Sequence, residues 1–160
     1  MIDDHRSDLR TWLSWVDDVT SEEDIAWRYE QCSISKSEGK SLRFFVLHNE
    51  SIIGMLAAKR IDWGASLAEL SYNLDPSFRG RGVITKACKE LISYFESSLG
   101  IENFEIHTAI GNRASERVAE RLGFEFIRID EKVEQLHGEW IHHKIYANKS
   151  AHTTPAIAPR

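Results

Sequence analysis

A turn rich in glycine and arginine is the segment of this sequence best suited to bind an anion. It carries Arg79, Gly80, Arg81 and Gly82 directly before a helical pattern. The glycines let the backbone approach a ligand, because no Cβ stands in the way. The free N–H groups and the dipole of a helix start attract negative charge, which makes a pyrophosphate the expected ligand. An ordinary glycine turn with two solvated arginines would show the same pattern.

The segments around this turn predict a strand before it and a helix after it. Residues 67–74 read as a strand that Pro76 ends, and apolar residues from Ile84 to Phe95 recur at helical spacing before Gly100. The other predicted elements are helices over 9–16 and 20–35, strands over 42–48, 52–61 and 104–110, a helix between Asn112 and Gly123, and a strand pair over 125–136 and 140–147. This order mixes antiparallel pairs with one strand–helix–strand crossover, so the expected fold class is α+β, or mixed α/β.

Composition narrows the range of functions. The chain has 160 residues and a formal net charge of −5, which lacks the broad positive field of a non-specific nucleic-acid binder. No apolar run approaches the roughly 18 residues of a membrane span. Cys32 and Cys88 are expected to be reduced thiols in a cytoplasmic protein. We expect one domain over residues 1–147 and a disordered tail over residues 148–160.

Metal binding has little support in the pattern. Seven histidines offer no ligand spacing beyond His142 and His143, and neighbouring side chains on a strand point to opposite faces. The sequence therefore predicts no metal site.

Four stretches of the chain follow one known family pattern in order. Arg79, Gly82 and Ile84 stand where that pattern has a Gln or Arg, two residues, Gly, one residue and then Gly or Ala, although Ile84 exceeds the usual small residue. The other stretches are residues 9–17, which match its first helix, residues 68–72, which match its Ala-Glu-Ile-Gly-Tyr strand, and residues 112–124, which match its Asn-x-x-Ser and Arg-x-Gly-Phe helix. The chain thus resembles the GNAT superfamily of N-acetyltransferases, and within it the ribosomal-protein N-terminal acetyltransferases.

The resemblance implies a fold and a cosubstrate. The GNAT fold has a central, mostly antiparallel sheet that splays at an acetyl-CoA cleft, with helices on both faces. The short strand that usually precedes its first helix has no counterpart in this sequence. The reaction is a direct transfer that needs acetyl-CoA and no metal. The acetyl-CoA-binding residues that the resemblance implies are Asn73, Leu74, Arg79, Gly80, Arg81, Gly82, Val83, Ile84 and Asn112.

The resemblance also implies roles for residues near the reacting atoms. Glu69 is the expected base for the amine, directly or through water, although a solvated or arginine-paired carboxylate would look the same in the sequence. Ser115 is expected to hydrogen-bond the departing sulfur, and Asn112 to orient the pantetheine or simply to cap its helix. The residues expected to bind the acceptor are Trp12, Trp15 and Tyr72.

Two positions depart from the family pattern. Many members carry a Tyr that protonates the thiolate, and this chain has Ala119 there; the related branch often has an Asp near the C-terminus, where this chain has His142.

The resemblance also implies the acceptor, which is a protein N-terminus such as that of a ribosomal protein. Amine basicity agrees with this expectation: an α-amine has a pKa near 7.7–8.0 and a lysine near 10.4, so an α-amine demands less of a base. An acetyltransferase of small amines (an antibiotic, a polyamine or an amino-acid derivative) and a non-catalytic acyl-CoA-binding module stay open, and so does a homodimer. Acidic residues at 17, 18, 22, 23 and 24 indicate either a solvated turn or a rim that attracts a cationic acceptor.

Overall fold

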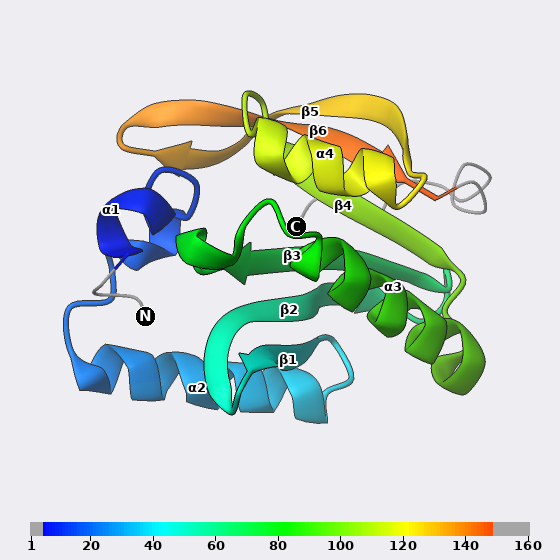
Figure 1. Ribbon diagram of the computed structural model, residues 1–160, viewed down its shortest axis with the longest axis horizontal. Coiled ribbons are helices and arrows are strands. Elements are labelled where there is room, and N and C mark those ends of the chain that lie inside the picture. Colours follow the sequence, from blue (N-terminus) through cyan, green and yellow to red (C-terminus); the bar gives the residue numbers. More distant parts are fainter. Residues whose placement is uncertain (1–4, 149–160) are drawn as a thin grey trace.

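The computed structural model describes residues 5–148 of the chain. Its helices are α1 (Arg6–Leu9), α2 (Glu22–Ser37), α3 (Val83–Tyr94) and α4 (Arg113–Arg121), with 3₁₀ turns at Ser14–Val16 and Pro76–Phe78 and a π turn at Phe95–Leu99. Its strands are β1 (Leu42–His48), β2 (Ser51–Asp62), β3 (Leu67–Leu74), β4 (Asn103–Ala109), β5 (Glu125–Leu136) and β6 (Glu139–Ala147). The element order is the one that the sequence predicts, and no strand precedes α1 within the described residues (Figure 1).

The six strands form one mixed sheet in the order β1-β2-β3-β4-β6-β5. Only β3 and β4 are parallel neighbours, because α3 crosses over between them; every other pair is antiparallel. The parallel pair is short, since it ends at Leu70 and Ile106. Beyond that point β3 stays beside β2, and β4 stays beside β6. The two central strands therefore diverge, which confirms the expected splay.

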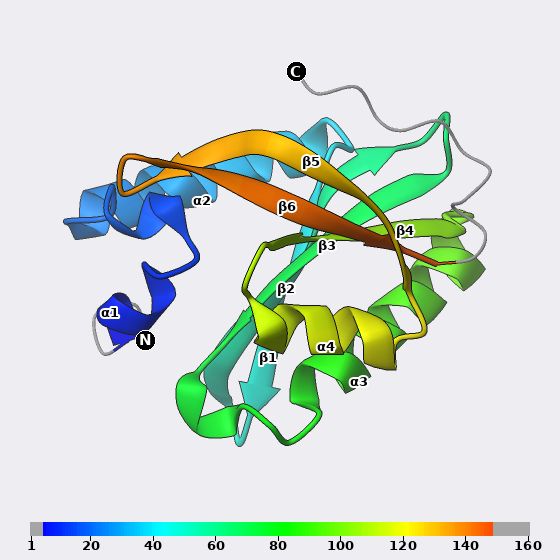
Figure 2. The same ribbon diagram turned by 90° about the horizontal axis from the view of Figure 1, so that it is seen from above.

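Helices cover both faces of this sheet. Phe44 of β1 packs against Tyr94 at the end of α3, with ring centroids 6.5 Å apart, whereas the next residue, Phe45, packs against Tyr29 of α2 at 6.4 Å. Adjacent strand residues point to opposite faces, so α2 and α3 lie on opposite sides. Figure 2 shows α4 beside α3, with α2 across the sheet from both.

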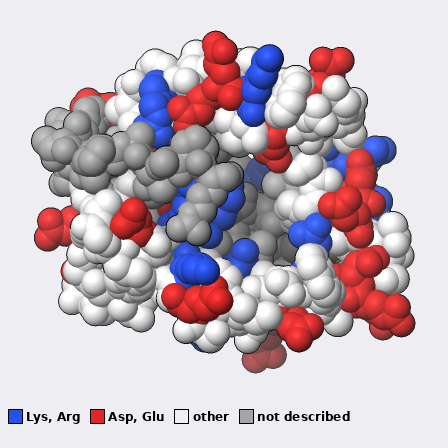
Figure 3. All heavy atoms as spheres, turned by 180° about the vertical axis from the view of Figure 1, so that it is seen from behind, with Lys and Arg blue, Asp and Glu red and all other residues white. Residues whose placement is uncertain are grey.

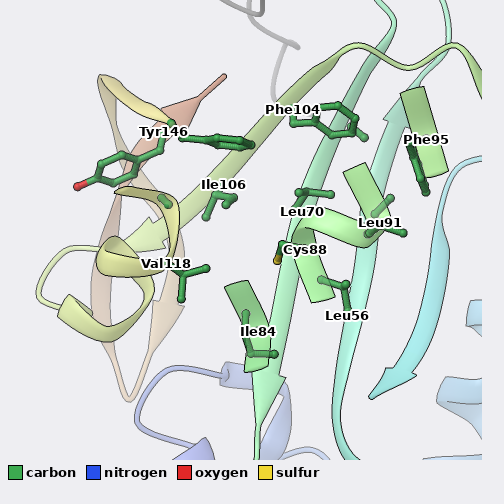
Figure 4. Packing of buried hydrophobic residues seen from close by; sticks show 14 of the residues in the cluster. Leu56, Leu70, Ile84, Cys88, Leu91, Phe95, Phe104, Ile106, Val118 and Tyr146 are labelled. Carbon is green, nitrogen blue, oxygen red and sulfur yellow. The ribbon is translucent and has the colours of Figure 1, made fainter. Parts of the chain in front are cut away.

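The main hydrophobic core lies between the sheet and the α3–α4 layer. Ile84, Cys88 and Leu91 recur on one face of α3 at helical spacing, and all three are buried. They pack against Leu70 and Ile106 on the two diverging strands, as Figure 4 shows. Burial raises the pKa of the Cys88 thiol to about 12, which suits a packing residue and not a nucleophile. This core fixes the starts of α3 and α4 above the splay.

The helix predicted from Leu9 to Val16 is wrong. The chain leaves helical geometry after α1 and makes only a 3₁₀ turn further on. Long-range contacts with the β5–β6 hairpin account for the difference. Ser14 Oγ donates to Glu134 Oε2 at 2.9 Å, and Arg10 O lies 3.0 Å from His137 Nε2. Threonine and tryptophan, which occupy the middle of this segment, are modest helix formers, so tertiary contacts decide its path.

The second helix and the hairpins follow local rules. Ser21 caps α2 and exchanges hydrogen bonds with Asp24, which is the capping box that the hydroxyl and early acids indicate. His137 and Gly138, at φ +52° and +86°, form the tight turn between β5 and β6. No helix in the described part of the chain is both long and apolar enough to cross a membrane.

Asn148 continues the fold, although the sequence assigns it to the tail. Its backbone N–H donates to Phe104 O at 3.1 Å, and its side-chain oxygen accepts from Phe104 N–H at 2.9 Å. Asn148 therefore extends the contact of β6 with β4 by one residue. The rest of the predicted tail, residues 149–160, lies outside the described residues.

Candidate active site

A cleft of about 990 Å³ opens where β3 and β4 diverge. One side, here called the α3–α4 side, is lined by the end of β3, the glycine turn and the first turns of α3 and α4. The other, the α2 side, is lined by α1, the 3₁₀ turn at Ser14–Val16, α2, β1 and residues of β5 and β6. Every predicted site residue lines this cleft except Arg81.

The glycine turn has the shape of an anion cradle. Gly80 and Gly82 both adopt φ +74°, a left-handed conformation that favours glycine, and a Cβ built at either position would meet no atom within 4 Å. Gly82 is the N-cap of α3 and supplies no side-chain cap. The N–H groups of the first turn are thus left for a ligand, where the helix dipole favours negative charge. These features fit a diphosphate.

The two arginines of the turn do not act together. Arg79 pairs with Asp8 of α1 through both terminal nitrogens and also donates Nε to Leu74 O at 3.3 Å. The hydrogen bond from Arg79 lowers the pKa of the Asp8 carboxyl, so the Asp8 carboxylate offsets the charge of the guanidinium. Through its bonds to Asp8 and Leu74, the Arg79 side chain stabilises the turn. Arg81 lies with its guanidinium 5.5 Å from the centre of the Phe78 ring, outside the cleft lining.

Two other arginines provide positive charge on the α3–α4 side. Arg117 and Arg121 of α4 both line the cleft, and Arg121 Nε donates to Thr85 Oγ1 of α3 at 3.3 Å. Their spacing of four residues places them on one helix face. That spacing is a signal that the sequence already contained and that our prediction did not use.

The edge of β3 offers backbone groups to the gap. Asp75 N–H donates to Ile53 O of β2 at 2.8 Å. Because hydrogen-bonded and non-hydrogen-bonded pairs alternate along an antiparallel ladder, the backbone groups of Asn73 face β2, whereas those of Tyr72 and Leu74 face the gap. An extended ligand lying between β3 and β4 would meet the backbone of Tyr72 and the N–H of Leu74 first, because Leu74 O already accepts from Arg79. Asn73 also lines the cleft, and its side-chain oxygen accepts from Met55 N–H of β2.

A pair of hydroxyl groups bridges the gap on the α3–α4 side. Tyr72 Oη lies 2.9 Å from Ser115 Oγ, and Ser115 N–H donates to Asn112 Oδ1, the N-cap of α4, at 3.2 Å. Burial raises the pKa of the Tyr72 phenol, so this hydroxyl keeps its proton. Ala119 is fully buried one turn further along α4. Ser115 and Tyr72 therefore bring two hydroxyl groups to the gap, and Ser71 of β3 and Thr108 of β4 also line the cleft.

Glu69 is buried in a network of ion pairs on the α2 side. Its carboxylate accepts from Lys59 Nζ at 2.9 Å and lies 3.4 Å from Arg60 Nη2 and 3.5 Å from His107 Nδ1. Burial alone would raise the pKa of Glu69, but the charges of His107 and Lys59 outweigh it and hold the pKa below its usual range. Glu69 is thus a weaker base than an isolated glutamate.

A second carboxylate, Glu134 of β5, faces the α2 side of the cleft. Its Oε1 lies 3.3 Å from His143 Nε2, and its Oε2 accepts from Ser14. The hydrogen bond with His143 lowers the pKa of the Glu134 carboxyl. Our sequence reasoning missed this group, because the register of β5 on β6 shifts between Asp130 and Glu134. Of the two adjacent histidines on β6, His143 lines the cleft and His142 does not.

The three residues predicted to bind the acceptor are separated in space. Trp12 and Trp15 line the α2 side, and the guanidinium of Arg28 lies 5.0 Å from the centre of the Trp15 ring. Tyr72 instead bonds to Ser115 on the opposite side. Among residues 5–148 no cluster of three or more His, Cys, Asp or Glu side chains has the geometry of a metal site.

Comparison with known proteins identifies the family. Residues 3–125 match the family model described as the acetyltransferase (GNAT) domain. The chain belongs to this GNAT family. The GNAT chain is 30% identical over 122 residues to YdaF of Bacillus subtilis (strain 168), a protein provisionally named a ribosomal N-acetyltransferase; the match covers 72% of this chain and 64% of YdaF. It is 31% identical over 119 residues to the ribosomal-protein-serine acetyltransferase of Escherichia coli (strain K12), and this match covers 72% of the chain and 66% of that relative.

A solved structure extends the likeness from sequence to fold. The microcin C7 self-immunity acetyltransferase MccE, crystallised with acetyl-CoA and AMP, superposes on the GNAT chain with a TM-score of 0.86 and 27% identity. The match covers 92% of this chain and 82% of MccE. The GNAT fold and the family predicted from the sequence are thereby confirmed. The chain spans slightly less than two thirds of the length of the two curated relatives.

Proposed function

We propose that this protein transfers an acetyl group from acetyl-CoA directly to the N-terminal α-amine of a polypeptide, such as a ribosomal protein. The observation that carries the proposal is the cleft itself. The glycine turn before α3, the edge of β3 that faces β4 and the Ser115–Tyr72 pair all line this one continuous space. The names of the two curated relatives support the ribosomal acceptor.

The α3–α4 side would hold acetyl-CoA. The diphosphate would lie on the N–H groups of the first turn of α3, beside Gly80 and Gly82, with Val83 and Ile84 lining the cleft below. The pantetheine would extend along the backbone groups of Tyr72 and the N–H of Leu74 and past Asn112. Arg79 would support this site indirectly, because its pair with Asp8 and its bond to Leu74 O hold the turn in place.

The chemistry then needs little from acid and base groups. The amine nitrogen attacks the thioester carbonyl carbon, the C–S bond breaks, and the amine loses one proton while coenzyme A leaves as a thiolate or a thiol. Ser115 would donate a hydrogen bond to the departing sulfur, and Tyr72 would orient that hydroxyl. A thiol pKa near 8.5 makes the thiolate an easy leaving group, so a hydrogen bond suffices.

Two carboxylates that line the cleft are candidates to receive the amine proton. Glu69 stays our sequence-based candidate, but its ion pairs keep it ionised and weakly basic. Glu134 has fewer cations around it, since the partners that it contacts are the His143 imidazole at 3.3 Å and the Ser14 hydroxyl at 2.9 Å. Comparing Glu69→Gln with Glu134→Gln across pH assigns the role: the base is the residue whose variant loses the acidic limb of the wild-type pH–rate profile, along which the carboxylate becomes protonated.

A second candidate function is acetylation of a small-molecule amine. It is favoured by the likeness to MccE, whose structure holds AMP together with acetyl-CoA. The aromatic residues Trp12 and Trp15 on the α2 side could stack on a planar ligand as readily as on a peptide.

The decisive experiment is an acetylation screen read by mass spectrometry. Purified protein and acetyl-CoA are offered peptide N-termini, peptide lysines with blocked N-termini, and small amines that include aminoacyl nucleotides. We expect acetylation of free peptide N-termini. Transfer to small amines alone would replace the leading proposal with the second one, and binding of acetyl-CoA without any transfer would indicate a binding module.

The described cysteines agree with a reducing compartment. Cys32 and Cys88 are both free thiols, as is usual for proteins of the cytosol. We propose a cytoplasmic location on this basis.

A further inference from the structure

The α2 side of the cleft is lined by more cations than its acids neutralise. Arg28 and Lys36 of α2, Arg43 of β1 and Lys59 of β2 all line it. Lys59 is paired with Glu69 at 2.9 Å. Glu134, another acid on this side, has His143 and Ser14 as partners. The remaining three cations have weak partners or none, so they outnumber the one acid that is not paired with a Lys or Arg, and this side carries an excess of positive charge.

Each of these three cations lacks a buried acidic partner among the residues that the structure describes. Arg28 lies 3.4 Å from Asp18, whose side chain is mostly exposed. Arg43 donates to the neutral hydroxyl of Ser41 at 3.1 Å. The side chain of Lys36 makes no hydrogen bond or ion pair with any residue of the described range 5–148, and only its backbone carbonyl accepts, from Gly39 N–H. Positive charge at Lys36 and Arg43 is thus available to a ligand.

Local structure brings Lys36 and Arg43 to the same end of the cleft. Ser35 Oγ of α2 and Ser41 Oγ, just before β1, lie 2.8 Å apart, and Arg43 bonds to that same Ser41. Arg28 and Lys36 are eight residues apart, which places them on one face of α2 about 12 Å from each other. The cations therefore form a row along α2 that ends at Lys36 and Arg43.

The acidic residues near the start of α2 do not line this space. Asp17 pairs with Arg10, Asp18 faces Arg28, and Asp24 caps α2. None of the acids at 17, 18, 22, 23 and 24 lines the cleft. An acidic rim that attracts a cationic acceptor, one of the two sequence-based interpretations, therefore lacks support, because the charge inside the cleft has the opposite sign.

Aromatic side chains complete the same wall. Trp12, Trp15, Tyr29 and Phe45 line the α2 side, and the rings of Tyr29 and Phe45 lie 6.4 Å apart. Figure 3 shows a hollow in this face of the molecule, with Lys and Arg side chains close to it and Asp and Glu side chains also at its rim. A ligand that fits this wall has apolar groups for the rings and a negative group for the cations.

We propose that Lys36 and Arg43, with Arg28 further along α2, bind an acidic side chain near the N-terminus of the acceptor polypeptide. This inference rests on the proposed function and names its substrate class: α-amines followed, within the first several residues, by Asp or Glu. An extended chain advances about 3.3 Å per residue, so about four residues span the row. The positive charge also speeds the encounter with an acidic segment.

The test compares three heptapeptides with free N-termini that differ only at residues 3–6, which are all Glu, all Gln or all Lys. We expect kcat/KM to fall in the order Glu, Gln, Lys, with roughly a five- to tenfold preference for Glu over Gln at low ionic strength. High salt should shrink that ratio, because the charges are partly exposed.

Variants then assign the preference to residues. In the double variant Lys36→Gln/Arg43→Gln the Glu-to-Gln ratio should drop to about one, and in Lys36→Glu/Arg43→Glu the Lys peptide should become the better substrate. Lys40→Gln is the matched control, because Lys40 pairs with Glu38 and does not line the cleft; it should keep the wild-type ratio. Circular dichroism checks that each variant is folded.

The possible failures are distinguishable. Equal use of the Glu and Gln peptides by the wild type, or an unchanged ratio in the double variants, would overturn the acidic subsite and leave N-terminal acetylation standing. Acetylation of none of the peptides, together with acetylation of small amines, would overturn both proposals.

Discussion

The two sides of the cleft are built in different ways. The α3–α4 side consists of consecutive segments: β3 leads into the glycine turn, the turn into α3, and Asn112 into α4. The α2 side is assembled from distant segments, since Ser14 reaches Glu134 across 120 residues and Arg10 reaches His137 across 127. One side follows from short motifs, and the other exists only once the chain has folded.

This difference agrees with our proposal that the α3–α4 side binds acetyl-CoA and the α2 side binds the acceptor. The solved structure of MccE also holds acetyl-CoA, and a local, motif-built site suits a donor that relatives share. Acceptors differ, and a wall that is assembled from α1, α2, β1 and the β5–β6 hairpin can change without disturbing the donor site. Substitutions on the α3–α4 side should therefore alter donor affinity or transfer, and substitutions on the α2 side should alter acceptor use alone.

The largest effect is expected at Gly82. In Gly82→Asp a carboxylate replaces open space at the anion cradle and a non-glycine residue is forced to φ +74°. We expect the Kd for acetyl-CoA to rise at least about 100-fold in isothermal titration calorimetry. Gly100→Asp is the control, because Gly100 also has positive φ and open space but lies outside the cleft lining. Equal affinity in Gly82→Asp and the wild type would contradict the placement of the diphosphate.

Ser115→Ala should separate transfer from binding on the same side. Removal of the hydroxyl that Tyr72 holds at 2.9 Å should lower kcat about 10- to 100-fold and leave the Kd for acetyl-CoA unchanged. Tyr72→Phe should give a smaller loss, because it only frees the serine rotamer. For both variants, single-turnover kinetics at saturating acetyl-CoA measure the transfer rate, and isothermal titration calorimetry measures the Kd for acetyl-CoA. Normal transfer with weakened binding would instead make Ser115 a donor-binding residue.

Glu69→Gln should change stability in a pH-dependent way. The pKa of Glu69 in the folded protein is lowered from an ordinary value of 4.5, so its ionised form stabilises the fold above that pH, and the stabilisation is lost as the pH falls through the folded pKa. Near neutral pH the variant should lose about 1–2 kcal/mol of unfolding free energy. Urea titrations at pH 7 and below pH 4 measure this, and a wild-type-to-variant difference that does not shrink in acid would count against the ion-pair network.

The smallest effect is expected from Ser14→Ala, which tests the α2 side of the cleft. Loss of the 2.9 Å bond to Glu134 should loosen the segment between α1 and α2 and raise the KM for a peptide acceptor about two- to fivefold. The Kd for acetyl-CoA should stay the same. Ser7→Ala is the control, because Ser7 lies on α1 outside the cleft lining. A weaker affinity for acetyl-CoA in Ser14→Ala would show that the two sides are coupled.

The elements could largely be predicted because their signals are local. Gly82 ends a strand-and-turn pattern and opens a helix, Ser21 begins a capping box, and the alternation along β3 places Glu69 on one face. Each of these depends on residues a few positions apart. The first helix was predicted wrongly for the opposite reason, since its path depends on a hairpin that lies more than 100 residues away in the sequence.

The candidate site shows the same limit. Its residue types were visible in the sequence, and all of those predicted except Arg81 line the cleft. Their partners were not visible in the sequence. Asp8 offsets the charge of Arg79, and Glu69 is buried among cations. It is also His143, and not His142, that lines the cleft, and all three outcomes depend on long-range contacts. A partner decides whether a charge is free to act, so residue type alone left the chemistry open.

By itself, then, the sequence determined the order of helices and strands, the glycine cradle at the start of α3 and the N-cap of α4, because backbone conformation and capping depend on near neighbours. Only the tertiary structure decided where β3 and β4 part, which hydroxyl meets Ser115 and which sign of charge lines the α2 side. Those features depend on strand register, including the shift between Asp130 and Glu134, and register follows from the packing of the whole sheet.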